Sequence, residues 1–197
     1  MNRTDKKPSF SIILAVQEQA EALQNQLPSL LTQQYDDFQV IVVDESSTDN
    51  TSDVLGCLKD EYPRLYNTFV PRYHFQRNPR RLAFTIGMKA AKNDWIIFTD
   101  LETLPTSETW LEELSEFAVS PNEMLLGYVK RKTGDVRLKS FEDISQAGNL
   151  VTKTERHRAN GSHHSSLFRH DYDFIAVRAD RGHELLRLFE QPKMRRL

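Results

Sequence analysis

Short runs of apolar residues alternate along the first two thirds of the chain with longer amphipathic segments. The runs at 10–16, 39–43 and 95–98 contain few polar positions, which is typical of strands buried on both faces of a parallel sheet. The segment at 18–33 places leucines at helical spacing, and a cluster of capping residues at 46–51 precedes the segment at 52–62. Both patterns predict helices packed on such a sheet. The alternation therefore predicts an α/β fold.

The remaining segments extend this order with decreasing regularity. Helices are expected over 82–92 and 108–119, and strands over 66–70, 73–76 and 124–129. Beyond residue 130 the pattern predicts a helix over 139–147, a strand over 174–178 and a terminal helix over 181–189. Strands and helices that alternate with short connections favour a mainly parallel central sheet with helices on both faces, in a single domain over residues 1–197.

Length and composition agree with a soluble, globular chain. Its 197 residues suit one domain, and 39% apolar with 27% charged residues is an ordinary composition for such proteins. We find no apolar run long enough to span a membrane and no signal-like segment before the first strand, so the cytoplasm is expected. Cys57 is the one cysteine, which leaves no internal disulfide and predicts a small buried residue rather than a nucleophile.

Charge is divided unevenly between the two parts of the chain. Residues 1–129 hold 11 Lys and Arg against 19 Asp and Glu, a net charge of −8, whereas residues 130–197 hold 15 against 9, a net charge of +6. This division fits solvated faces of different sign, a metal beside a phosphate, or peripheral contact with the inner face of a membrane. No interleaved basic and aromatic pattern favours nucleic acid.

Two of the buried runs end abruptly in carboxylates. Asp44 and Glu45 follow one run, and Asp100 and Glu102 follow another. The carboxyl edge of an open α/β sheet is where ligands bind, and magnesium or manganese often takes one or two protein carboxylates together with phosphate oxygens. Solvated turn residues are the alternative interpretation of the same acids.

Other motifs narrow the choice of chemistry. No dinucleotide glycine fingerprint and no Walker loop is present, which argues against the common nicotinamide and nucleoside-triphosphate folds. Four histidines gather in a polar segment, but their spacing matches no standard zinc pattern, and a solvated loop is the favoured interpretation. They are His157, His163, His164 and His170.

Three segments in order resemble the family 2 glycosyltransferases of GT-A fold. The first combines the strand at 11–16 with the end of its helix at 30–35. The second is 40–51, which is similar to that family's strand and Asp-Asp-x-Ser-Thr-Asp turn. The third runs from 87–92 into 96–102, followed by Pro105 and the pair at 110–111. The similarity covers roughly residues 9–118.

The resemblance implies a Rossmann-like nucleotide-sugar transferase, with a donor half at 9–118 and a shortened acceptor half at 119–197. It assigns Asp100 and Glu102 to a divalent Mn²⁺ or Mg²⁺ on the donor diphosphate. The nucleotide-sugar contacts that it implies fall on Ala15, Gln17, Glu18, Asp44, Glu45 and Asn78. The acceptor would be a glycan or a lipid-linked molecule.

The sequence departs from the family where chemistry is expected. Pro-x-aromatic-Asn-Glu is replaced by residues 15–19, and Ala-Arg-Asn is replaced by 83–85, which is partly apolar. An inverting reaction needs a base to deprotonate the acceptor hydroxyl, and no acid near the last strand has the expected setting; the candidates are Asp171, Asp173 and Asp180. A non-catalytic binding module, which could act with a partner transferase, is therefore the alternative. A nucleotidyltransferase is less favoured because no glycine-rich, lysine-bearing loop follows the first strand.

Overall fold

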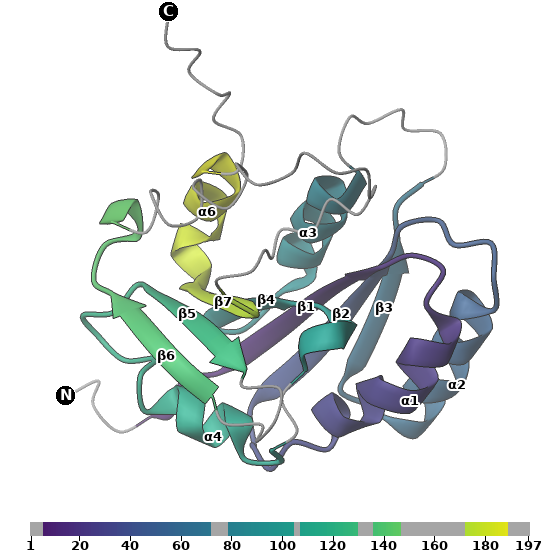
Figure 1. Ribbon diagram of the computed structural model, residues 1–197, viewed down its shortest axis with the longest axis horizontal. Coiled ribbons are helices and arrows are strands. Elements are labelled where there is room, and N and C mark those ends of the chain that lie inside the picture. Colours follow the sequence, from purple (N-terminus) through teal and green to yellow (C-terminus); the bar gives the residue numbers. More distant parts are fainter. Residues whose placement is uncertain (1–5, 72–78, 105–106, 130–135, 147–171, 189–197) are drawn as a thin grey trace, which may run out of the picture.

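A seven-stranded sheet organises the part of the chain that the computed structural model describes, which is residues 6–71, 79–104, 107–129, 136–146 and 172–188 (Figure 1). The strands are β1 (Phe10–Val16), β2 (Phe38–Asp44), β3 (Leu65–Phe69), β4 (Trp95–Thr99), β5 (Met124–Val129), β6 (Val136–Phe141) and β7 (Phe174–Arg178). The helices are α1 (Ala20–Leu31), α2 (Thr51–Glu61), α3 (Pro79–Ala90), α4 (Trp110–Ser115) and α6 (Gly182–Leu188). Two 3₁₀ turns, η1 (Leu101–Thr103) and η3 (Ala179–Arg181), follow β4 and β7.

The strand order is β3-β2-β1-β4-β7-β5-β6, and it confirms the predicted α/β class. The first four strands are parallel, with β1 in the middle, paired to β2 on one side and to β4 on the other. The last three strands join by antiparallel pairing, so the sheet as a whole is mixed. The register sets Val16 beside Asp44 and Leu14 beside Thr99, which brings the carboxyl ends of β1, β2 and β4 to one edge.

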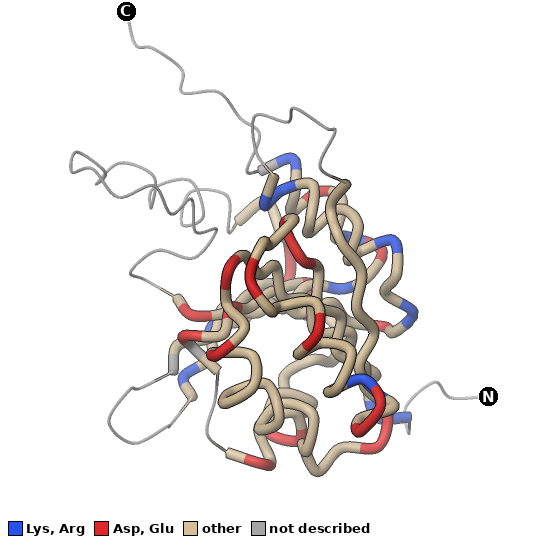
Figure 2. The backbone as a smooth tube through the Cα atoms, turned by 90° about the vertical axis from the view of Figure 1, so that its right-hand side faces the viewer, with Lys and Arg blue, Asp and Glu red and all other residues tan. Residues whose placement is uncertain are grey.

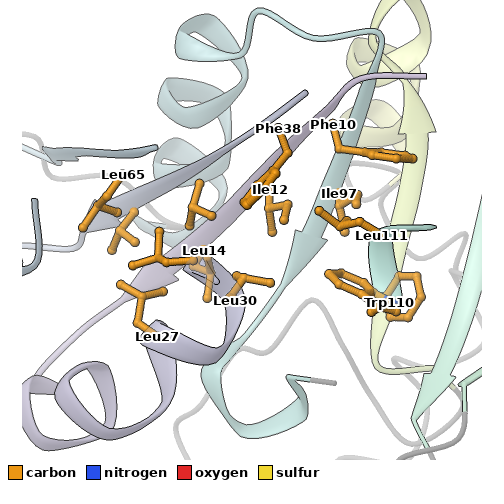
Figure 3. Close-up of a cluster of buried hydrophobic side chains, with 14 of the residues drawn as sticks. Phe10, Ile12, Leu14, Leu27, Leu30, Phe38, Leu65, Ile97, Trp110 and Leu111 are labelled. Carbon is orange, nitrogen blue, oxygen red and sulfur yellow. The ribbon is translucent and has the colours of Figure 1, made fainter. Parts of the chain in front are cut away.

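Helices cover both faces of the sheet, as the apolar pattern predicts. Alternate residues of each buried strand point to opposite faces, so Ile12 and Leu14 pack with α1, α2 and α4, whereas Ile13 packs with α3 and α6. Figure 3 shows part of the first cluster, in which leucines of α1 lie below β1 and Trp110 lies near Leu111. The ring of Trp110 meets that of Phe174 edge to face, with centroids 5.0 Å apart.

Close packing limits side-chain size at two glycines, one in the β5–β7 strand pair and one where α3 packs on β1. A Cβ added to Gly127 on β5 would overlap the ring of Phe174, and one added to Gly87 on α3 would overlap the side chain of Ile13. Absence of a side chain therefore leaves room for the Phe174 ring over Gly127 and lets α3 approach β1 at Gly87.

Two sequence predictions are wrong in the described residues. The helix expected over 139–147 is replaced by a strand up to Phe141, and helical residues begin only at 144. Cys57 is exposed rather than buried, because Leu55 and Leu58 direct the opposite side of α2 toward the core. The strand expected over 73–76 lies outside the described residues. Among the described helices, none combines the length and apolar character needed to cross a bilayer.

Candidate functional site

Two pairs of acids lie at the same edge of the parallel half of the sheet. Asp44 ends β2 and is half-buried, and Glu45 follows it, with its N–H donating to the carbonyl of Val16 at 2.8 Å. Asp100 follows β4 and is half-buried, whereas Glu102 is exposed on η1. One strand, β1, separates the two pairs. Figure 2 views the molecule from the right-hand side of Figure 1 and shows acidic positions across the middle of this face.

The turn after β2 is folded by short polar contacts. The Oδ1 atom of Asp44 accepts hydrogen bonds from the N–H of Ser47 at 3.0 Å and from its hydroxyl at 2.5 Å. Ser46 has a left-handed φ of 67°, and its hydroxyl donates to the carbonyl of Val70 at 2.5 Å. A non-glycine residue in that region is held against a conformational cost by its surroundings. The turn is therefore built to fix the residues that follow β2.

Glu18 connects this turn to the loop that follows β1. Its carboxylate accepts from the N–H and the hydroxyl of Thr48, at 2.7 and 3.1 Å, and from the N–H of Asp49 at 3.1 Å. Its own N–H donates to the hydroxyl of Ser47 at 2.9 Å, and its φ is 52°. Both carboxylate oxygens are thus occupied by the β2–α2 loop. The role that the structure gives Glu18 is to tie the two loops together.

Glu45 lies buried beneath the start of α3. Its residue is 8% exposed, and its Oε1 atom is 3.7 Å from Nη1 of Arg80. Burial raises the pKa of Glu45, the charge of Arg80 opposes that rise, and the charge of Asp44 adds to it. The guanidinium of Arg80 also lies 6.0 Å from the ring centroid of Phe84. Sequence reasoning missed Arg80, because nothing local to residue 80 indicates that α3 packs its first turn against the end of β2.

Of the other residues predicted to bind the nucleotide sugar, Ala15 and Gln17 lie within the described residues. Ala15 is 1% exposed and its side chain belongs to the core, so only its backbone is available at this edge. Gln17 is exposed directly after β1. Asn78 and the four histidines between 157 and 170 lie outside the described residues. The assignment of these residues to a nucleotide sugar stays a prediction.

The second acid pair has the chemistry of a site for a hard divalent cation. Two carboxylates, with the remaining oxygens supplied by phosphate and water, match how magnesium is usually bound in proteins. Within the described ranges, no group of three or more His, Cys, Asp or Glu side chains could hold a metal. The assignment of Asp100 and Glu102 to a divalent cation on the donor diphosphate therefore stays a prediction.

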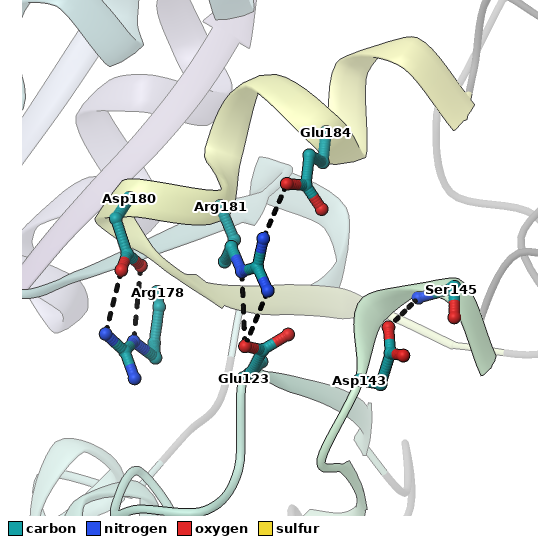
Figure 4. Close-up of polar contacts among 7 residues, drawn as sticks. All are labelled: Glu123, Asp143, Ser145, Arg178, Asp180, Arg181 and Glu184. Carbon is teal, nitrogen blue, oxygen red and sulfur yellow. Dashed lines mark hydrogen bonds and ion pairs between the residues drawn. The ribbon is translucent and has the colours of Figure 1, made fainter.

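Among the described acids of the second half, Glu123, Asp180 and Glu184 form ion pairs (Figure 4). Asp180 bonds the guanidinium of Arg178 at 2.8 Å, and Arg181 bridges Glu123 at 2.9 Å and Glu184 at 2.6 Å. Of these three contacts, the one between Arg181 and Glu123 joins distant segments, because it links η3 to the residue before β5.

Of the two other candidates for a catalytic base, one lies within the described residues and one lies outside them. Asp173 donates its N–H to the carbonyl of Gly127, at the start of β7. Asp171 lies outside the described residues. Within the described part of the second half, the catalytic base therefore stays unassigned.

The sequence pattern of the family described as "Glycosyl transferase family 2" matches residues 11–174. Among curated proteins, the poly-beta-1,6-N-acetyl-D-glucosamine synthase of Staphylococcus aureus (strain COL) is 22% identical over 140 residues, which is 71% of this chain and 31% of that protein. An uncharacterized glycosyltransferase of Nostoc is 30% identical over 94 residues, 47% of this chain and 28% of that protein. The chain thus spans under a third of the length of these relatives.

Solved structures share the fold. The mannosyltransferase PcManGT from Pyrobaculum calidifontis, in complex with GDP-Man and Mn²⁺, superposes with a TM-score of 0.61 at 18% identity, covering 92% of this chain and 47% of that one. S. aureus TarS 1–349 in complex with UDP-GlcNAc gives a TM-score of 0.52 at 24% identity, covering 62% and 34%. At these identities the likeness is one of architecture.

Proposed function

This chain belongs to glycosyl transferase family 2, and on that premise we propose that it transfers a sugar from a nucleotide-diphosphate donor to a glycan or lipid-linked acceptor. The observation that carries the proposal is the arrangement of the two acid pairs. They extend from β2 and β4 at one edge of the sheet, on either side of the end of β1. Ligands of open α/β sheets bind at such an edge.

The end of β2 would receive the nucleoside. Asp44 and Glu45 offer carboxylate oxygens that accept hydrogen bonds, and ribose hydroxyls and base N–H groups are matching donors. The turn at Ser46 and Ser47 and the Glu18 connection hold this part of the chain in one conformation. A preorganised acceptor set loses less entropy when the donor binds.

The end of β4 would receive the diphosphate. Asp100 and Glu102 would hold a divalent cation there, and their oxygen donor set suits Mn²⁺ or Mg²⁺. When bound, that cation stabilises the negative charge that develops on the departing nucleoside diphosphate. The structural neighbour PcManGT was solved with GDP-Man and Mn²⁺, which supports the same pairing of donor and cation in this chain.

Donor binding without transfer is a second candidate. One observation favours it: among the described acids near β7, Asp180 is already bound to Arg178. A base that accepts the proton of an acceptor hydroxyl needs a free carboxylate within hydrogen-bond reach. Incubation of the purified chain with a radiolabelled donor separates the two functions. Transfer or donor hydrolysis supports the enzyme, and intact donor with measurable binding supports the module.

A donor screen by thermal unfolding tests the proposal directly. UDP, GDP and dTDP sugars are added with and without Mn²⁺, because a ligand that binds only the native state raises the melting temperature. A hundredfold excess over Kd stabilises by about 2.7 kcal/mol, or roughly 5–10 °C for a chain of this size. Asp100→Asn should abolish the metal-dependent part of the shift. Asp94→Asn is the matched control, since Asp94 precedes β4 at its opposite end and bonds Ser9. If none of these donors raises the melting temperature, that result contradicts the proposal.

A further inference from the structure

The ion pair between Arg80 on α3 and Glu45 at the end of β2 is largely buried and leaves polar atoms without hydrogen-bond partners. The side chain of Glu45 is 5% exposed and that of Arg80 is 21% exposed, and the closest charged atoms are 3.7 Å apart. The Oε1 atom of Glu45 and the Nε atom of Arg80 are both buried without a hydrogen-bond partner. A saturated structural ion pair would satisfy these atoms, since buried polar groups are normally hydrogen-bonded.

The ionisation of the buried Glu45 carboxyl group depends on the charge of Arg80. A buried carboxylate loses the hydration that stabilises its charge, so burial favours the neutral acid. Within the described part of the chain two charged groups act on it: Arg80 from α3 favours the ionised form, and Asp44 from β2 opposes it. Arg80 in turn lies over the Phe84 ring one helical turn away, a position that steadies a guanidinium.

We propose that Arg80 is a positioning residue of the donor site, which keeps Glu45 ionised and oriented at the end of β2 so that it can accept hydrogen bonds from the nucleoside of the donor. The inference rests on the proposed function. Arg80 acts through Glu45 and need not touch the donor itself. An ionised carboxylate accepts hydrogen bonds at both oxygens, whereas a protonated one presents a donor in place of one acceptor.

The test measures the affinity of the nucleoside diphosphate that the wild type binds, by calorimetry between about pH 5.5 and about pH 8.5. Wild type, Arg80→Gln and Arg80→Lys are compared with Arg64→Gln. Arg64 is a matched control, because it lies over the Phe38 ring at 4.4 Å and bonds backbone carbonyls at the far end of β2. Melting curves establish that each variant is folded.

Loss of the positive charge in Arg80→Gln raises the pKa of Glu45 further, so the neutral acid persists to higher pH. We expect this variant to bind about tenfold more weakly than wild type near neutral pH and to recover affinity as the pH rises. Arg80→Lys should retain most of the affinity, and Arg64→Gln should follow the wild-type profile.

Wild-type affinity in Arg80→Gln, or a loss that is the same at every pH, overturns the inference while leaving the proposed function intact. Absence of nucleotide binding by the wild type overturns the proposed function and with it the donor-site role. In that case, unfolding curves without ligand still decide whether Arg80 controls the ionisation of Glu45. If it does, Arg80→Gln loses stability relative to wild type as the pH rises.

Discussion

Replacing Glu18 with glutamine removes the connection between the β1–α1 and β2–α2 loops while preserving side-chain shape. The carboxylate accepts three hydrogen bonds, two from backbone N–H groups and one from a hydroxyl. A glutamine amide keeps one accepting oxygen and turns an NH₂ group toward a loop N–H that also donates. At least one charge-assisted hydrogen bond is therefore lost, and two donors are brought face to face.

The size of the effect follows from that geometry. A hydrogen bond to a charged group contributes about 1.5–3 kcal/mol, and because Glu18 is exposed we take the lower end. A loss of about 1.5 kcal/mol lowers the melting temperature of a chain of this size by roughly 3–6 °C. If the donor binds only when the loop is ordered, the same energy raises Kd about tenfold.

Differential scanning calorimetry and nucleotide titration measure the two quantities. Glu21→Gln is the control, because it makes the same change of charge at an exposed position in the first turn of α1. The control should leave both quantities near wild type. A Glu18→Gln protein with unchanged melting temperature and unchanged affinity would refute the idea that this carboxylate organises the β1–α1 and β2–α2 loops.

Two further predictions concern packing and pH. Gly127→Ala should destabilise the protein by about 1–3 kcal/mol in chemical denaturation, because the added Cβ meets the Phe174 ring. Gly56→Ala on α2 is the control, and it should stabilise by up to about 1 kcal/mol, because its Cβ meets nothing. Equal effects of the two substitutions would contradict the packing argument. The raised pKa of Glu45 means that the native state holds its proton more tightly than the unfolded chain. The stability that protonated Glu45 contributes below its ordinary pKa is therefore lost as the pH rises through its pKa in the folded state. Denaturation at a series of pH values should show that Glu45→Gln gains on wild type upward from about pH 4.5, and a constant difference would contradict the assignment.

The parallel half of the sheet is largely readable from sequence because its signals are local. Residues 95–98 are apolar on both faces, as a central strand requires, and all five residues of β4 are buried. Helix α1 is equally legible, since its four buried leucines follow a single helical stripe. The acids at the ends of β2 and β4 are also predictable, because parallel strands place their carboxyl ends at one edge.

The remaining features depend on contacts between distant segments. The strand β6 alternates inward Val136 and Leu138 with outward Arg137 and Lys139, but its identity rests on pairing with β5. Glu18 lies about 30 residues from the loop that it holds, and Arg80 meets Glu45 only because α3 packs at that point. Local sequence propensity does not encode such long-range contacts. Sequence reasoning could therefore name Glu18 and Glu45, but it could not name the residues that they contact.

The central position of β1 has a consequence for ligand size. With strands spaced about 4.8 Å apart, the interposed β1 keeps the tips of β2 and β4 roughly 10 Å from one another. A ligand that contacts both acid pairs of the proposed site has to extend across the end of β1. The position of β1 in the proposed site thus makes the length of the ligand a condition for contact with both acid pairs at once.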